Sequence, residues 1–124
     1  MQKYLLHRIR SFGFALKGIK DLIKNHPNAQ IHLLATWIVI IASIWLKVTA
    51  TEGCLLALCI VLVLALEAMN SAIEYLADKI SPEQDLLIGK AKDIAAGAVL
   101  IAAVGAAIVG CLIFLPKLWL AFAQ

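Results

Sequence analysis

The sequence has few charged residues for its length. Asp, Glu, Lys and Arg make up 15% of its 124 residues, whereas hydrophobic residues make up 63%. An average soluble domain is about 25% charged and about 45–50% apolar, and a chain this short buries only a modest share of its surface on folding. The composition therefore excludes an ordinary soluble domain, a disordered chain and a basic nucleic-acid-binding module. It favours one integral membrane domain over residues 1–124, with no nucleic-acid partner.

Neither the cysteines nor the glycines of the sequence form a recognisable functional motif. The three cysteines, Cys54, Cys59 and Cys111, lie within apolar runs and form no Cys-x-x-Cys pair. We interpret them as small hydrophobic side chains that indicate nothing about the redox compartment. The sequence also has no Walker-type glycine-rich loop and no protein-kinase signature, so any nucleotide site must be built in another way.

The segment from about residue 3 to 24 predicts an amphipathic helix. Its apolar residues recur every three or four positions, which places them on one helix face: Leu5, Ile9, Phe12, Leu16, Ile19 and Ile23. Residues 1–30 also hold six of the eleven basic residues and only one acid. A helix packed on a soluble core has the same pattern, but a basic amphipathic helix is typical of the membrane interface. We expect an interfacial helix over residues 1–27, ended near Pro27.

Three apolar stretches predict transmembrane helices at about residues 29–48, 54–76 and 94–115. The uncharged core of the first, residues 31–46, needs extension to reach the roughly 20 residues of a span. The last is twenty-two uncharged residues, which we expect Pro116 to end, and its small residues recur every four positions, as in helices that pack closely. The basic N-terminal region places the N-terminus in the cytoplasm, with the loop at residues 77–93 on the same side.

The polar residues of the second predicted span form a stripe. Glu67, Asn70, Glu74 and Asp78 are separated by 3, 4 and 4 residues, which places them on one side of a helix. Glu67 follows a long uncharged run, and an acid at membrane depth is functional by default. A structural acid at a helix end is an adequate interpretation of Asp78 and Glu74, but it suits Glu67 poorly.

Two lysines follow at the expected start of the last helix, in residues 89–93 (Gly-Lys-Ala-Lys-Asp). A lysine before a helix start can contact a phosphate, because the helix N-terminus favours anions. The alternative is the usual positive-inside lysine pair. Together with the acidic stripe, the lysines suggest a base, a metal-binding acid and phosphate-binding cations on one side of the membrane. Those groups are the requirements of phosphoryl transfer.

Residues 67–78, EAMNSAIEYLAD, resemble the signature Glu-x-x-Asn-[Ser/Thr]-Ala-Ile-Glu-x-x-x-Asp of the small prokaryotic diacylglycerol kinases. Residues 91–100, 14–18 and 31–33 are similar to other blocks of that family, so the resemblance covers nearly the whole chain. It implies an all-α bacterial inner-membrane protein with an N-terminal interfacial helix, three transmembrane helices per subunit and a homotrimeric assembly. It also implies a lipid kinase that transfers the γ-phosphate of ATP, with Mg²⁺, to diacylglycerol and gives phosphatidic acid.

The resemblance also implies roles for individual residues. Glu67 would be the general base that activates the lipid hydroxyl, and Glu74 would hold Mg²⁺ on the ATP phosphates. Asn70 would orient the reacting groups, and Asp78 would support the site. The remaining residues would contact ATP: Lys92, Asp93, Glu83, Gln84 and Asp85.

The sequence departs from the family at one metal ligand, because His26 stands where the family has a glutamate. Magnesium prefers oxygen ligands, so His26 is a poor second ligand and the preferred metal stays open. The substrate is open too, since residues 31–33, 81–83 and 95–99 look closer to the undecaprenol kinases of the family. Two alternatives of other classes are a catalytically weak structural membrane protein and a small transporter with Glu67 as proton carrier.

Overall fold

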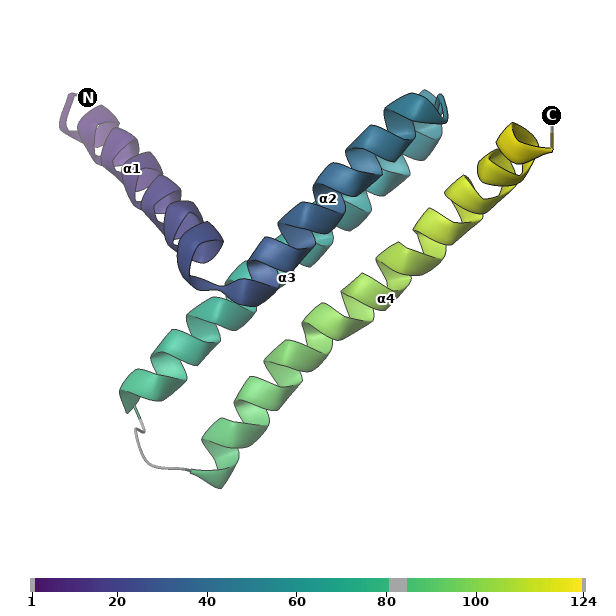
Figure 1. The fold of residues 1–124 in the computed structure, drawn as a ribbon. Helices are drawn as coiled ribbons and strands as arrows, with labels where there is room; N and C mark the ends of the chain where they lie inside the picture. The colour runs from purple at the N-terminus through teal and green to yellow at the C-terminus, as the bar shows by residue number, and fades with distance from the viewer. Residues whose placement is uncertain (1, 81–84, 124) are drawn as a thin grey trace.

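The computed structural model describes residues 2–80 and 85–123, with side chains from Arg10 onward. Within these residues the chain forms four helices (Figure 1): α1 (Gln2–Asn25), α2 (Pro27–Trp45), α3 (Ala50–Ile80) and α4 (Leu86–Phe122). By length and composition, α2, α3 and α4 could each cross a membrane. The expected all-helical class with three apolar helices is therefore confirmed.

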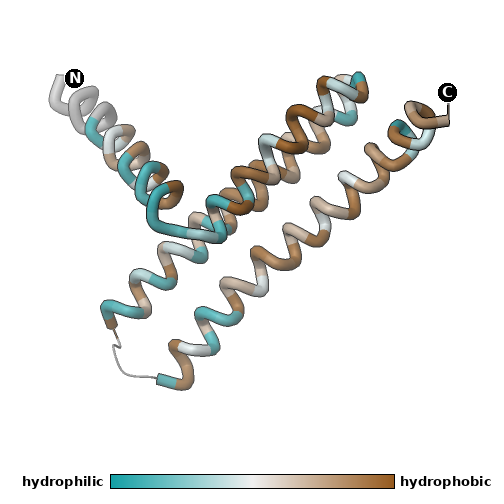
Figure 2. Tube along the Cα trace, in the orientation of Figure 1, coloured by the Kyte–Doolittle hydropathy of each residue, from teal (hydrophilic) through white to brown (hydrophobic). Residues whose placement is uncertain are grey.

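The three apolar helices lie side by side, and α1 diverges from them. α3 packs mainly against α4, and α2 lies along the first part of α3, as Figure 1 shows. α1 meets α2 and α3 only near its C-terminal end. Hydrophilic residues gather along α1, at the α1–α2 corner and at the adjoining ends of α3 and α4, whereas the long middle parts of α2–α4 are hydrophobic (Figure 2). Apart from a smaller polar group at the α2–α3 turn and the end of α4, the hydrophilic residues thus lie toward one end of the bundle.

The corner between α1 and α2 follows from one proline. Pro27 is the first residue of α2, a position where its missing N–H costs nothing and its fixed φ suits a helix. His26 precedes it in extended conformation, with φ −114° and ψ 105°, as expected before proline. The amide of Gln30 donates to the carbonyls of Ile23 and Lys24, at 3.2 Å each. This contact satisfies two carbonyls that the end of α1 leaves unpaired, and the predicted break near Pro27 is confirmed.

The turn between α2 and α3 is fixed by Glu52. Its carboxylate accepts hydrogen bonds from the backbone N–H and the hydroxyl of Thr49, at 2.8 and 2.9 Å, and the Glu52 N–H donates to the Thr49 hydroxyl at 3.4 Å. This reciprocal pair is a capping box, with the local signal Thr-x-x-Glu. The same carboxylate forms an ion pair with Lys117 of α4, at 3.1 Å. Glu52 therefore starts α3 and joins it to the far end of α4.

Both ends of α4 differ from the expectation. The helix begins at Leu86 because Asp85 caps it, accepting from the N–H groups of Leu87 and Ile88 at 2.8 and 3.0 Å. Much of the expected loop at residues 77–93 is therefore helical, since α3 also continues to Ile80. The expectation that Pro116 ends the helix is wrong, because α4 continues through it to Phe122. A proline removes only its own donor and can kink a helix without ending it.

The buried side chains of the described residues are few. The buried hydrophobic ones are mostly small or of moderate size: Ala29, Leu56, Val63, Ala77, Val99, Ala102 and Ile113. Most large apolar side chains of α2, α3 and α4 are exposed. A single chain therefore leaves an apolar exterior that only lipid or further protein could cover in a membrane.

We expect Glu52→Ala to lower the thermal stability of the protein in detergent more than Glu52→Gln does. Glutamine can still close the capping box and removes only the charge, whereas alanine removes both the cap and the ion pair. Lys117→Gln should lower the transition temperature as much as Glu52→Gln does. The Glu52→Gln/Lys117→Gln double variant should lower it no further than either single variant, because both remove the same ion pair. Circular dichroism during heating measures the transition, and Lys79→Gln controls for loss of one lysine. A Glu52→Ala protein that melts with the wild type would contradict this function of Glu52.

Candidate active site

The most deeply buried polar side chain in the described part of the chain is the carboxylate of Glu67. Its residue is 2% exposed, and its neighbours Asn70 and Ser71 are 3% and 5% exposed. No residue within 2–80 or 85–123 gives the Glu67 carboxylate a hydrogen bond or an ion pair. A buried charge without a partner is costly. Groups of this kind cluster at functional sites rather than in structural cores.

Glu67 faces a small, partly polar pocket instead of a protein partner. The pocket has a volume of about 190 Å³. Its polar lining comes from Glu67 and Asn70 of α3 and from Asn28 and His32 of α2, and its apolar lining comes mainly from α4. A hydroxyl group placed there would meet a carboxylate able to accept its proton.

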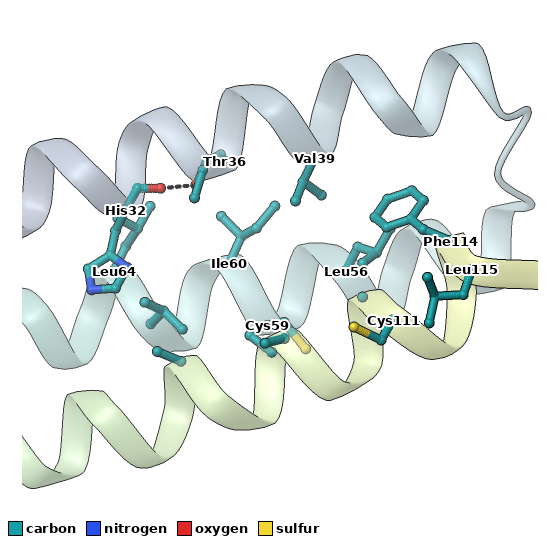
Figure 3. Close-up of a pocket in the computed structure, with 16 residues that line it drawn as sticks. His32, Thr36, Val39, Leu56, Cys59, Ile60, Leu64, Cys111, Phe114 and Leu115 are labelled. Atoms are coloured by element: carbon teal, nitrogen blue, oxygen red, sulfur yellow. Dashed lines mark hydrogen bonds between the residues drawn. The ribbon is translucent and has the colours of Figure 1, made fainter. Parts of the chain in front are cut away.

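An apolar groove of about 420 Å³ adjoins this pocket and shares His32 and Ala103 with it. Side chains of α2, α3 and α4 line it. Figure 3 shows His32 at one end of the groove, with Phe114 and Leu115 at the other. The hydroxyl of Thr36 donates to the backbone carbonyl of His32 at 2.8 Å, which leaves the groove wall apolar at that point. An elongated apolar space beside a buried carboxylate suits the chain of an amphipathic molecule.

Glu74 lies one turn beyond Asn70 and is held by it. The amide nitrogen of Asn70 donates to one carboxylate oxygen of Glu74, at 3.0 Å. The amide oxygen of Asn70 and the hydroxyl of Ser71 are buried and have no partner among the described residues. Ser71 was not singled out from the sequence, although its place one turn after Glu67 was a usable signal. The site thus holds unsatisfied donors and acceptors around two carboxylates, as a binding site does.

Lys92 and Asp78 form an ion pair between α4 and α3, with 2.9 Å between Nζ and Oδ1. Lys92 lies in the second turn of α4, so the expectation that it precedes the helix is wrong. The first N–H groups of α4 are already bound by Asp85, and the helix N-terminus gives no anion site at Lys92. Asp93 beside it is exposed. The structure thus brings Lys92 and Asp78 together near the outer end of the acidic stripe.

The other residues expected to contact ATP are distributed unevenly. Asp85 uses one carboxylate oxygen to cap α4. Glu83 and Gln84 lie outside the described residues. Within the described residues no three His, Cys, Asp or Glu side chains are close enough together to form a protein-only metal site. Any divalent ion here would need oxygen ligands from a substrate or from water.

A second polar cluster lies where α1, α2 and α3 meet. The hydroxyl of Tyr75 donates to Asp21 at 2.8 Å, and the amide of Asn25 donates to the other oxygen of Asp21 at 2.6 Å. The ring of His26 packs edge-on against that of Tyr75, with 5.0 Å between centroids, and its Nε2 is buried without a partner among the described residues. The hydrogen bonds from Tyr75 and Asn25, and then the charge of His26, hold the pKa of Asp21 below its usual value. Sequence reasoning found His26 here but missed Asp21 and Tyr75.

Comparisons with known proteins match most of the chain. The sequence model of the prokaryotic diacylglycerol kinase family matches residues 13–114. The chain is 38% identical over 109 residues to the undecaprenol kinase of Bacillus subtilis (strain 168), covering 88% of this chain and 89% of that one. It is 34% identical over 105 residues to the diacylglycerol kinase of Escherichia coli (strain K12), covering 85% and 86%. It is 36% identical over 98 residues to the diacylglycerol kinase of Haemophilus influenzae, covering 79% and 83%.

Proposed function

The chain belongs to the prokaryotic diacylglycerol kinase family and is a lipid kinase. We propose that it phosphorylates the hydroxyl group of a membrane lipid, with Glu67 as the general base. The observation that carries this proposal is a buried carboxylate, without a protein partner, that faces a small, partly polar pocket beside an apolar groove. The pocket would hold the hydroxyl and the groove one hydrocarbon chain. Along α4 the groove lining runs from Ala103 to Leu115, a rise of about 18 Å at 1.5 Å per residue, which is long enough for an acyl chain.

In the proposed reaction, Glu67 accepts the proton of the lipid hydroxyl while that oxygen attacks the γ-phosphorus of ATP. ADP leaves as the bond between the β- and γ-phosphates breaks. Asn70 orients Glu74 and the reacting groups, and Lys92, held by Asp78, neutralises phosphate charge. Phosphoryl transfer depends mainly on this positioning and charge neutralisation. Asp93, Glu83, Gln84 and Asp85 are proposed to contact the nucleotide.

Magnesium fits this arrangement through Glu74. Asn70 occupies only one oxygen of the Glu74 carboxylate, which leaves the other for a cation. Mg²⁺ is usually held by one or two carboxylates together with substrate phosphates and water, so a cluster of protein ligands is not required. Bound there, Mg²⁺ would neutralise the phosphate charge that develops during transfer. His26 is a poor candidate for a second ligand, because imidazole suits softer metals.

Diacylglycerol, which would give phosphatidic acid, and undecaprenol are the two candidate substrates. Relatives named for each are 34–38% identical to this chain. Identity does not separate the two lipids, because a relative named for each is 38% identical to this chain over 109 residues. The single apolar groove accepts one chain of either lipid.

The membrane placement and assembly are also part of the proposal. α1 is proposed to lie in the cytoplasmic interface of the bacterial inner membrane, because Phe12, Leu16, Ile19 and Ile23 of its apolar face are exposed in the single chain, as in interfacial helices. A homotrimer is proposed, since most large apolar side chains of α2–α4 lack protein neighbours. The small residues of α4 face the helices of their own chain, since Ala102 is buried and Ala106 and Gly110 line the apolar groove.

We expect the purified protein in lipid vesicles to transfer label from γ-labelled ATP to a lipid. Diacylglycerol and undecaprenol, offered in separate reactions at equal mole fraction, should differ in kcat/KM, and the better one is the substrate. Label in neither lipid would support the structural-protein alternative instead.

Glu67→Gln is expected to reduce lipid phosphorylation by about 10²–10⁴-fold, the usual contribution of a general base. Glutamine keeps the size of the side chain but cannot take the proton. Folding should persist, because the variant removes an unpaired buried charge. Glu52→Gln makes the same chemical change outside the site and should retain activity. Initial rates measure both, and a Glu67→Gln enzyme with most of its activity would exclude Glu67 as the base.

His26→Glu is expected to lower the magnesium concentration needed for half-maximal rate, since it adds a second carboxylate near the proposed metal. His26→Gln, which adds an oxygen without charge, serves as the control and should change the curve less. Titrations of magnesium and manganese against initial rate measure the effect. Superimposable curves for all three proteins would show that position 26 has no part in metal binding.

The protein in mild detergent is expected to have the mass of three chains. Light scattering with subtraction of the bound detergent gives that mass. A monomer that retains lipid kinase activity would overturn the proposed trimer while leaving the proposed chemistry intact.

A further inference from the structure

The connection of α1 to the rest of the protein depends on a small contact. α1 diverges from α2 and α3 over most of its length (Figure 1). The hydrogen bond from Tyr75 to Asp21, at 2.8 Å, joins α3 to the last turns of α1 across 54 residues of sequence. A helix with so few neighbours is held in place by such contacts and by whatever surface it lies on.

Tyr75 is next to Glu74 in sequence and lies about 100° around the helix from it. Its ring also packs against His26, nearly perpendicular to it at 73°, an arrangement favoured by aromatic pairs. One side chain of the stripe-bearing helix thus contacts both α1 and the corner that precedes α2. The position is a variable one in the signature of residues 67–78, so the resemblance assigns it no role.

The acceptor of this hydrogen bond, the carboxylate of Asp21, is well suited to join α1 to α3. Asp21 is ionised at neutral pH, and its two oxygens are bound by Tyr75 and by Asn25. Hydrogen bonds to an ionised acceptor are stronger than neutral ones. Lys20 and Lys24 lie on either side of Asp21 in the sequence of α1, so the contact to Asp21 constrains the part of α1 that carries these two basic residues.

We propose that Tyr75 is a positioning residue, which holds the last turns of α1 and their basic residues against α3, at the residue that follows Glu74, through its hydrogen bond to Asp21 and its contact with His26. The proposal rests on the proposed function, in which Glu74 binds the magnesium and phosphates of ATP. Release of α1 would remove positive charge from the neighbourhood of those phosphates. The consequence is weaker binding of MgATP, with little effect on the proton transfer at Glu67.

The decisive variant is Tyr75→Phe, which removes the hydroxyl and keeps the ring on His26. We expect the KM for MgATP to rise by about two- to tenfold, the range that one net hydrogen bond supplies, with kcat nearly unchanged. Asn25→Ala is the matched control. It removes a hydrogen bond to the same carboxylate but none between helices, and its KM should equal that of the wild type. Asp21→Ala combined with Tyr75→Phe should be no worse than Asp21→Ala alone.

A second measurement does not depend on activity. Spin labels at Lys17→Cys and Lys79→Cys, with the native cysteines replaced by alanine, report the distance between α1 and the end of α3. The distance distribution should broaden in Tyr75→Phe and stay narrow in Asn25→Ala. An unchanged distribution would overturn the proposal.

The outcomes separate this proposal from the proposed function. An unchanged KM in Tyr75→Phe, with Glu67→Gln still inactive, would overturn the positioning role and leave the kinase mechanism standing. A fall in kcat without a change in KM would also overturn it, because the phosphate-binding side would then be intact. If the wild-type chain phosphorylated no lipid, the proposed function would fail, and with it the role of Tyr75 in MgATP binding. The distance measurement would then decide only whether Tyr75 holds α1.

Discussion

The burial of one carboxylate constrains the rest of this structure. Glu67 is 2% exposed within a bundle whose other deeply buried side chains are mostly apolar, and no described residue pairs with it. A chain selected for stability alone would place an apolar residue there, because burying a carboxylate is costly. Asn70 and Ser71 add further buried polar atoms without partners. Glu67 and Asn70 line the pocket that residues of α2 and α4 leave open beside α3, so much of the cost is concentrated where a ligand would relieve it.

The acidic stripe of α3 is also a gradient of exposure. Glu67 is buried, Glu74 is half-buried and Asp78 is exposed, since the stripe runs from the middle of the helix to its end. On the proposed function, each position suits one reactant. The lipid hydroxyl would reach the buried end from the apolar groove, and the charged phosphates would reach the exposed end from water. One helix could thus present a base to the lipid and a metal ligand to the nucleotide. The lipid chain would stay in apolar surroundings, and the phosphates would stay near water.

The sequence predicted these features where the signal was local or periodic. The stripe followed from the spacing of Glu67, Asn70 and Glu74, and the three long helices followed from uncharged runs. The ends of the helices were harder to predict. α4 begins at a cap made by Asp85 and continues through Pro116, and in both places a residue that often ends or interrupts a helix competes with the helical tendency of its neighbours. The Thr49–Glu52 capping box has a local sequence signal, Thr-x-x-Glu, from which the start of α3 could be predicted. The contact between Tyr75 and Asp21 was not readable, since no periodicity relates residues 54 positions apart.

The corner between α1 and α2 is held by contacts among His26, Tyr75 and Asp21. His26 stands where the resemblance to the family implies a glutamate, and its ring packs on Tyr75 and supplies no carboxylate. The corner still contains a carboxylate, that of Asp21, but both of its oxygens already accept hydrogen bonds. A carboxylate held in this way serves the placement of α1 better than it could serve a metal, because a cation would compete with Tyr75 and Asn25 for the same oxygens. The corner therefore serves as a structural joint, and on the proposed function a divalent cation would be bound by Glu74 and by the oxygens of the nucleotide.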